Sequence, residues 1–159
     1  MVKEPKELHI KWAEGIMKAY DWLKENDWID EDLRINFMED EGSFYYIKQK
    51  LINVDLKEVE ETEPIIDECT GLDVFLHEVG HHIHMTHLDG EDLDILYSVH
   101  NRCVDYLAQF NLPPEQELPL YWQTPIEAEA EIGRKYLREV LKKNRVIPSE
   151  TIPGQLTFL

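Results

Sequence analysis

The sequence predicts an α+β fold in a single domain. Apolar residues recur at three- and four-residue steps near both ends of the chain and after residue 71, which is the spacing of amphipathic helices. Between residues 33 and 59, β-branched and aromatic residues flank a turn cluster at 40–43, as in a small sheet. A chain of 159 residues with 43% hydrophobic residues is long enough for one core. We therefore expect one domain over 1–159, with 148–159 as a C-terminal tail.

The N-terminal part is expected to hold one helix followed by the sheet. The helix covers about residues 6–25, where the apolar side chains share one face. The strands are expected around residues 35–37, over 44–47 and over 51–56, and we expect them to pair as a small antiparallel-containing sheet.

The remainder is expected to be helical. Thr70 is a suitable N-cap for a helix over about residues 71–85. A third helix is expected over about 91–110, and Pro113, Pro114 and Pro119 then predict an extended loop over 113–119. Thr124-Pro125 begins the last helix, which continues to about residue 143.

Composition excludes several classes of partner. The net charge is −17, and because phosphate contacts need a basic surface, we expect no nucleic-acid partner. No apolar run approaches the roughly 20 residues of a membrane span, so we expect no membrane partner either. The charged start and the two isolated cysteines, Cys69 and Cys103, favour a cytoplasmic location. The oligomeric state stays open.

The helix over 71–85 carries the pattern H-E-x-x-H, from His77 through Glu78 to His81. The two histidines lie one turn apart, so both rings can reach one zinc ion. Neutral imidazoles leave the charge of the metal intact, which acidifies a bound water, and an adjacent carboxylate then acts as general base. His77 and His81 are thus predicted metal ligands, and Glu78 the predicted general base.

A catalytic zinc site needs a third protein ligand and an open position. The last helix offers three carboxylates, Glu127, Glu129 and Glu131. Thr124 and Glu127 also have the spacing of a capping box. If Glu127 capped its own helix, Glu129 or Glu131 would be the ligand.

An H-E-x-x-H helix followed by a helix with a ligand Glu resembles the gluzincin metallopeptidases. The E-x-E-A run that begins at Glu127 is similar to the second motif of the ImmA/IrrE-like peptidases. The resemblance implies a compact zincin-like domain, a Zn²⁺ cofactor and endopeptidase activity on a peptide or protein substrate. It also implies that Glu127 is the third ligand and that Glu131 supports a ligand histidine. Which substrate is cleaved, and where, stays open.

The same resemblance implies a Tyr or His that stabilises the oxyanion. His100 and Tyr121 are the first candidates, and Tyr97 and Tyr136 are further ones. It also implies an edge strand above the cleft that pairs with an extended substrate, for which residues 51–56 are the candidate.

Two alternatives remain open at the sequence level. In a metzincin-like peptidase the third ligand would be His87, six residues after His81. In a non-catalytic zinc-binding regulatory module, a fourth protein ligand such as His84 or Cys69 would close the metal off.

Overall fold

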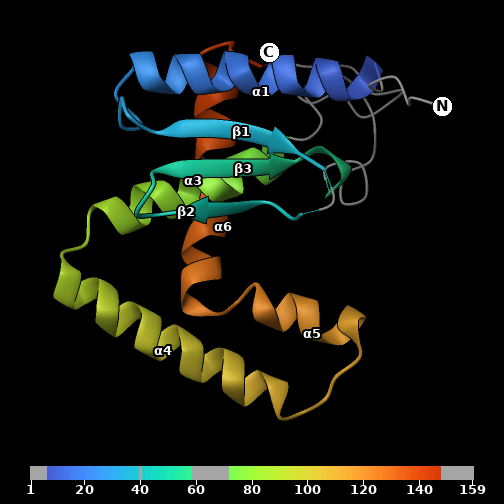
Figure 1. The fold of residues 1–159 in the computed structure, drawn as a ribbon, viewed down its shortest axis with the longest axis vertical. Helices are drawn as coiled ribbons and strands as arrows, with labels where there is room; N and C mark the ends of the chain where they lie inside the picture. The colour runs from blue at the N-terminus through green and yellow to red at the C-terminus, as the bar shows by residue number, and fades with distance from the viewer. Residues whose placement is uncertain (1–6, 40, 59–71, 148–159) are drawn as a thin grey trace.

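The computed structural model describes residues 7–39, 41–58 and 72–147 (Figure 1). The Thr70 cap, Cys69 and the tail over 148–159 lie outside these residues. In chain order, the helices and strands are α1 (Glu7–Glu25), β1 (Arg34–Met38), β2 (Phe44–Tyr46), β3 (Leu51–Asp55), α3 (Leu72–Thr86), α4 (Gly90–Ala108), α5 (Pro114–Tyr121) and α6 (Pro125–Lys143). The α+β class is confirmed, and α1, α3, α4 and α6 begin and end within two residues of the predicted bounds.

The three strands form a mixed sheet in the order β1-β3-β2. β2 pairs with β3 antiparallel, as expected, but β1 pairs with β3 parallel, with Arg34 opposite Leu51. β3 is therefore the central strand, and the prediction that residues 51–56 form an edge strand is wrong. Its burial explains the position, because four of its five residues are buried and a central strand is covered on both edges.

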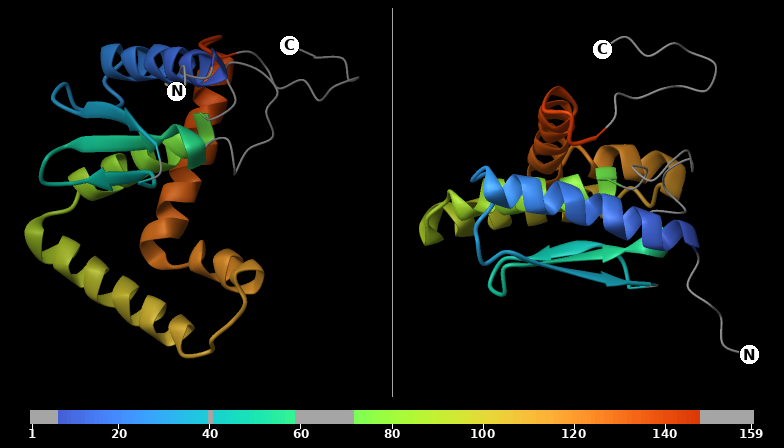
Figure 2. Two further views of the ribbon diagram at one scale, coloured as in Figure 1. Left: turned by 45° about the vertical axis from the view of Figure 1, so that its right-hand side comes forward. Right: turned by 90° about the horizontal axis from the view of Figure 1, so that it is seen from above.

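The strands, α3 and α6 lie in successive layers. Figure 2 shows the sheet on one side of α3 and α6 on the other, with α1 running along the top of the molecule near β1. The buried core gathers apolar side chains from α1, β3, α3 and α6: Trp12, Ile16, Leu23, Ile52, Val54, Phe75, Leu76, Val79, Leu137 and Leu141. Helix α3 is thus held between two packed layers, which fixes the residues that it carries.

The backbones of α3 and α6 touch where they cross. A Cβ on Gly80 would lie 2.5 Å from the Ala130 carbonyl oxygen, and one on Gly133 would lie 3.0 Å from the Gly80 Cα. Only glycine permits so close an approach. The crossing therefore places the first two turns of α6 against the middle of α3.

His82 joins α3 to the sheet side of the molecule. It is fully buried, and its Nε2 accepts from the Asp30 backbone N–H at 3.2 Å. Its Nδ1 therefore carries the proton of the neutral ring and donates to the Tyr45 hydroxyl oxygen at 3.1 Å. Burial lowers the pKa of His82, and burial likewise raises the pKa of Tyr45 to about 12.

Helices α4 and α5 project from this body on the side away from α1 (Figure 1). The prediction of an extended loop over 113–119 is wrong in part, because α5 begins at Pro114. Proline is compatible with the first turn of a helix, and Pro119 removes one backbone hydrogen bond without ending α5. Within the described residues, no helix combines the length and apolarity that crossing a membrane requires.

Candidate metal centre

Helix α3 brings His77, Glu78 and His81 together as the sequence predicts. Each residue is buried, with 6–7% of its surface exposed, and one donor atom from each lies within 4.8 Å of the others. The two imidazoles meet edge to face with ring centroids 4.8 Å apart. These three residues could hold one metal ion.

Glu127 reaches the same point from α6. Its Oε2 lies 2.7 Å from Nε2 of His77 and 3.5 Å from Nε2 of His81. Zinc–ligand bonds of about 2.0–2.1 Å in a tetrahedron put neighbouring donor atoms about 3.3–3.5 Å apart. The observed distances differ from this spacing by less than about 1 Å, so small side-chain shifts would let an ion enter between these donor atoms.

The predicted capping box does not form. Thr124 occupies the N-cap position of α6, but its side chain makes no cap hydrogen bond. The Thr124 hydroxyl instead donates to the Tyr121 carbonyl oxygen at 2.6 Å. Because Glu127 is not used as a cap, its carboxylate is available to face the histidines.

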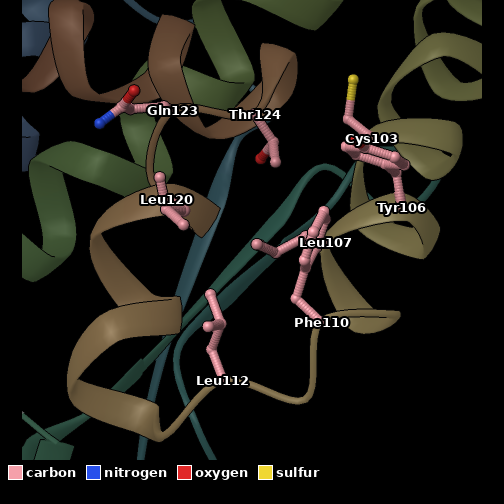
Figure 3. A pocket seen from close by; sticks show the side chains of 8 residues that line it. All are labelled: Cys103, Tyr106, Leu107, Phe110, Leu112, Leu120, Gln123 and Thr124. Atoms are coloured by element: carbon pink, nitrogen blue, oxygen red, sulfur yellow. The ribbon is translucent and has the colours of Figure 1, made fainter.

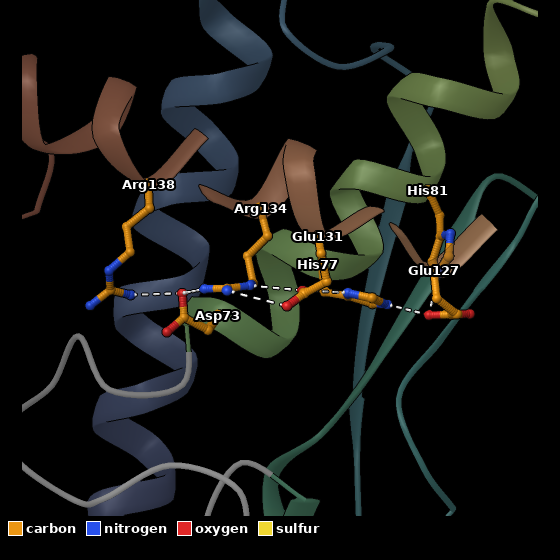
Figure 4. Close-up of polar contacts among 7 residues, drawn as sticks. All are labelled: Asp73, His77, His81, Glu127, Glu131, Arg134 and Arg138. Carbon is orange, nitrogen blue, oxygen red and sulfur yellow. Dashed lines mark hydrogen bonds and ion pairs between the residues drawn. The ribbon is translucent and has the colours of Figure 1, made fainter. Parts of the chain in front are cut away.

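Glu131 supports the other side of the His77 ring. The His77 Nδ1–H donates to Glu131 Oε2 at 2.9 Å, which directs Nε2 toward Glu127. Arg134 donates to Glu131 from Nε at 2.8 Å and also bonds Asp73 at 2.9 Å. Arg138 bonds the same Asp73 oxygen at 3.0 Å, so a chain of charged side chains runs from Arg138 to His77 (Figure 4).

The pKa shifts of His77, Glu127 and Glu78 are consistent with the contacts described above. Burial alone would lower the pKa of His77, but its hydrogen bonds to the carboxylates of Glu127 and Glu131 outweigh burial and raise it. Burial alone would raise the pKa of Glu127, but the two histidines hold it far below its ordinary range. Burial raises the pKa of Glu78 to about 8, so without a metal this carboxyl is largely protonated at neutral pH. A cation beside it would favour its ionised form.

His100 and Tyr121 both border the cluster. The Ile126 backbone N–H donates to His100 Nδ1 at 3.3 Å, so the neutral ring carries its proton on Nε2. The Tyr121 hydroxyl donates to Glu127 Oε1 at 3.3 Å, and burial together with this carboxylate raises the Tyr121 pKa to about 12. Both candidates can therefore donate a hydrogen bond at neutral pH.

A cleft of about 510 Å³ opens over these residues. His77, Glu78, His81, His100, Tyr121 and Glu127 all line it. Its other walls include Phe44 and Tyr45 of β2 and Leu118 and Trp122 around α5. Of the two edge strands, β1 and β2, it is β2 that lines the cleft.

Other candidate residues lie apart from the cluster. His87 is exposed on the turn after α3. Glu129 is exposed on α6, and Tyr136 is 60% exposed and contacts Trp28. Tyr97 lines the cleft, but its hydroxyl points to the Met85 sulfur at 3.7 Å.

The sequence reasoning missed two neighbours of His77. The Trp122 ring packs against the imidazole with centroids 4.9 Å apart, and Arg134 holds the carboxylate that orients it. The sequence did contain a signal for Arg134, because Glu131 and Arg134 stand three residues apart on a helix and can form an ion pair. Trp122 carried no such signal, because it precedes the helix and its position depends on α5.

The assembled side chains suit metal-assisted hydrolysis. Two imidazoles and one carboxylate are a donor set typical of catalytic zinc, and the open cleft leaves room for water and a substrate. A buried carboxyl with a raised pKa lies beside the ligands, where a general base is needed. Comparison of the chain with protein-family models, with curated proteins and with solved structures finds no match.

Proposed function

We propose that this protein is a zinc-dependent endopeptidase of the gluzincin type. The observation that carries the proposal is the position of Glu127 Oε2 against Nε2 of both His77 and His81, beside the buried Glu78. The E-x-E-A resemblance points to the same residue.

Zinc held by His77, His81 and Glu127 would supply a Lewis acid that polarises the scissile carbonyl and acidifies a water. Glu78 accepts the proton of the attacking water and passes it to the leaving amine. The Tyr121 hydroxyl and the His100 Nε2–H donate to the oxygen on which negative charge develops. Glu131 holds the His77 ring in the tautomer that directs Nε2 toward the ligand position.

The cleft supports a peptide as substrate. Its walls combine the edge strand β2, whose backbone can pair with an extended chain, with the apolar side chains of Leu118 and Trp122. A metal held only for structure is usually enclosed by four protein ligands, and here the donors open onto about 510 Å³ of space.

The test is a Glu78→Gln variant compared with wild type in metal content and in cleavage of a peptide library. We expect the variant to keep its zinc and to lose cleavage by about 10²–10⁴-fold, the range of general-base contributions. Glu129→Gln, an equivalent change at an exposed position on α6, is the control and should leave cleavage unchanged. If wild type and Glu78→Gln bind zinc and are equally inert, the protein is a zinc-binding module instead of a peptidase.

A further inference from the structure

Helices α4 and α5 expose an unusual number of apolar side chains. In α4 only His100 and Leu107 are buried, and α5 has no buried residue. The large apolar side chains that are exposed over this part of the chain are Ile95, Val99, Tyr106, Phe110, Leu118, Leu120 and Trp122. Such concentrated exposure is typical of an interaction surface.

Part of this surface is a groove between the two helices, separate from the metal centre. It encloses about 390 Å³ and is lined mostly by apolar side chains, including Tyr106, Leu107, Phe110, Leu112 and Leu120 (Figure 3). Tyr106, Phe110 and Leu120 are 64%, 55% and 44% exposed. The groove can therefore take apolar side chains from a second molecule without any change in the core.

The charge of the segment that carries α4 and α5 indicates the kind of molecule that the groove can bind. Residues 89–123 contain the acidic residues Asp89, Glu91, Asp92, Asp94, Asp105, Glu115 and Glu117, and a single basic one, Arg102. Within the part of the chain that the structure describes, Asp105, Glu115 and Glu117 make no ion pair. A second copy of this chain, with a net charge of −17, would bring the same negative charge to the surface.

We propose that the α4–α5 groove binds a cationic amphipathic helix of a partner protein. Its apolar face fills the groove between Tyr106, Phe110 and Leu120, and its Lys or Arg side chains pair with Glu117, which lies one turn before Leu120 on α5. Helix α5 lies between the two hollows, since Leu118 lines the cleft and Leu120 lines the groove. A docked partner is thus held next to the cleft, but its binding requires neither the metal nor catalysis.

The probe is a fluorescent synthetic peptide in which Leu recurs at helical positions i, i+3, i+4 and i+7 and Lys fills the other positions. We expect saturable binding that weakens with salt. The double variant Tyr106→Ser, Phe110→Ser should weaken binding by at least about tenfold, because central apolar side chains dominate such interfaces. Glu117→Gln should weaken binding and reduce its salt dependence, because it removes the carboxylate nearest to Leu120 on α5.

Matched changes elsewhere provide the controls. Ile132→Ser with Tyr136→Ser removes two equally exposed apolar side chains from α6, and Glu14→Gln with Glu25→Gln removes two exposed charges from α1. Both should bind the peptide as wild type does. The proposal fails if these controls weaken binding as much as the groove variants, or if a Glu-for-Lys peptide binds equally well. It also fails if wild type self-associates in sedimentation and Phe110→Ser abolishes this, because the occupant would then be a second copy.

Discussion

Glu127 is the residue on which the proposed metal centre depends most. It is the side chain that reaches from α6 to both histidines of α3. His87, the alternative ligand, is exposed on the turn after α3. Substitution of Glu127 and substitution of His87 are therefore expected to have different effects on metal binding.

We expect Glu127→Ala to lose bound zinc, because two imidazoles remain as protein ligands and catalytic zinc sites have three. His87→Ala should keep zinc in full. The measurement is zinc content per chain after dialysis, with folding checked by circular dichroism. Loss of zinc from the His87 variant alone would support the metzincin-like arrangement.

Arg134 supports the proposed metal centre indirectly, through Glu131. It holds Glu131, which holds His77, and its other contact is Asp73 on the opposite helix. We expect Arg134→Met to weaken zinc affinity by about 10–100-fold, as loss of outer partners usually does. The measurement is competition with a chromophoric chelator. Lys135→Met, at the exposed neighbouring position, is the control, and equal affinity in both variants would show that Arg134 has only a structural role.

At the scale of elements, the crossing of α3 and α6 sets the distance between Glu127 and the two histidines, the proposed metal ligands. The contact of Gly80 with the Ala130 carbonyl leaves no space for a methyl group. Glu127 lies about one turn before Ala130, so any separation of the helices moves its carboxylate away from His77 and His81.

We therefore expect Gly80→Ala to destabilise the fold by about 1–3 kcal/mol, the usual cost of overpacking, in spite of the higher helix propensity of alanine. Zinc affinity should fall as well. Urea unfolding and chelator competition measure the two effects. Gly90→Ala is the matched control, since a Cβ there meets nothing within 4 Å, and a variant at position 80 as stable as this control would contradict the crossing.

Elements with strong local sequence patterns could be predicted, whereas features that depend on contacts between distant residues could not. The amphipathic periods of α1, α3, α4 and α6 and the H-E-x-x-H spacing are local, so their positions follow from the sequence. The parallel pairing of β1 with β3 depends on a contact that residues 39–50 must cross, and nothing in either strand encodes its direction. The role of Glu127 was undecided because its position, three residues after Thr124, suits a cap as well as a ligand. The Thr124–Tyr121 bond and the contacts of Glu127 with His77 and His81, which the sequence does not encode locally, argue against the cap.

At the scale of the whole molecule, His82 makes stability depend on pH. Burial lowers its pKa in the fold, so the folded state favours the neutral ring. The stabilisation is complete above the ordinary histidine pKa of about 6.5 and is lost as the pH falls below it. The loss is at most about 1.4 kcal/mol per pH unit for one proton.

We expect the free energy of unfolding of the metal-free protein to fall more between pH 7 and pH 5.5 for wild type than for His82→Gln, which keeps an acceptor for the Asp30 N–H. Urea unfolding at both pH values measures the difference. The raised pKa of His77 acts in the opposite direction, but it is present in both proteins and cancels in the comparison. Parallel losses in the two proteins would exclude His82 as the source.

Helix α6 packs into the core at its C-terminal end and carries the proposed ligand Glu127 near its N-terminal end. Leu137 and Leu141 belong to the main core, while Glu127 lies beyond the Gly80 crossing, near α5 and the cleft. The helix can therefore tilt about its backbone contact with Gly80, so its two ends move in opposite directions. A small tilt of the half that carries Leu137 and Leu141 moves the carboxylate of Glu127. Glu131 lies next to the contact with Gly80 and moves least. Substitutions around Leu137 and Leu141 can thus change the distances between the proposed metal ligands without altering any of these ligands.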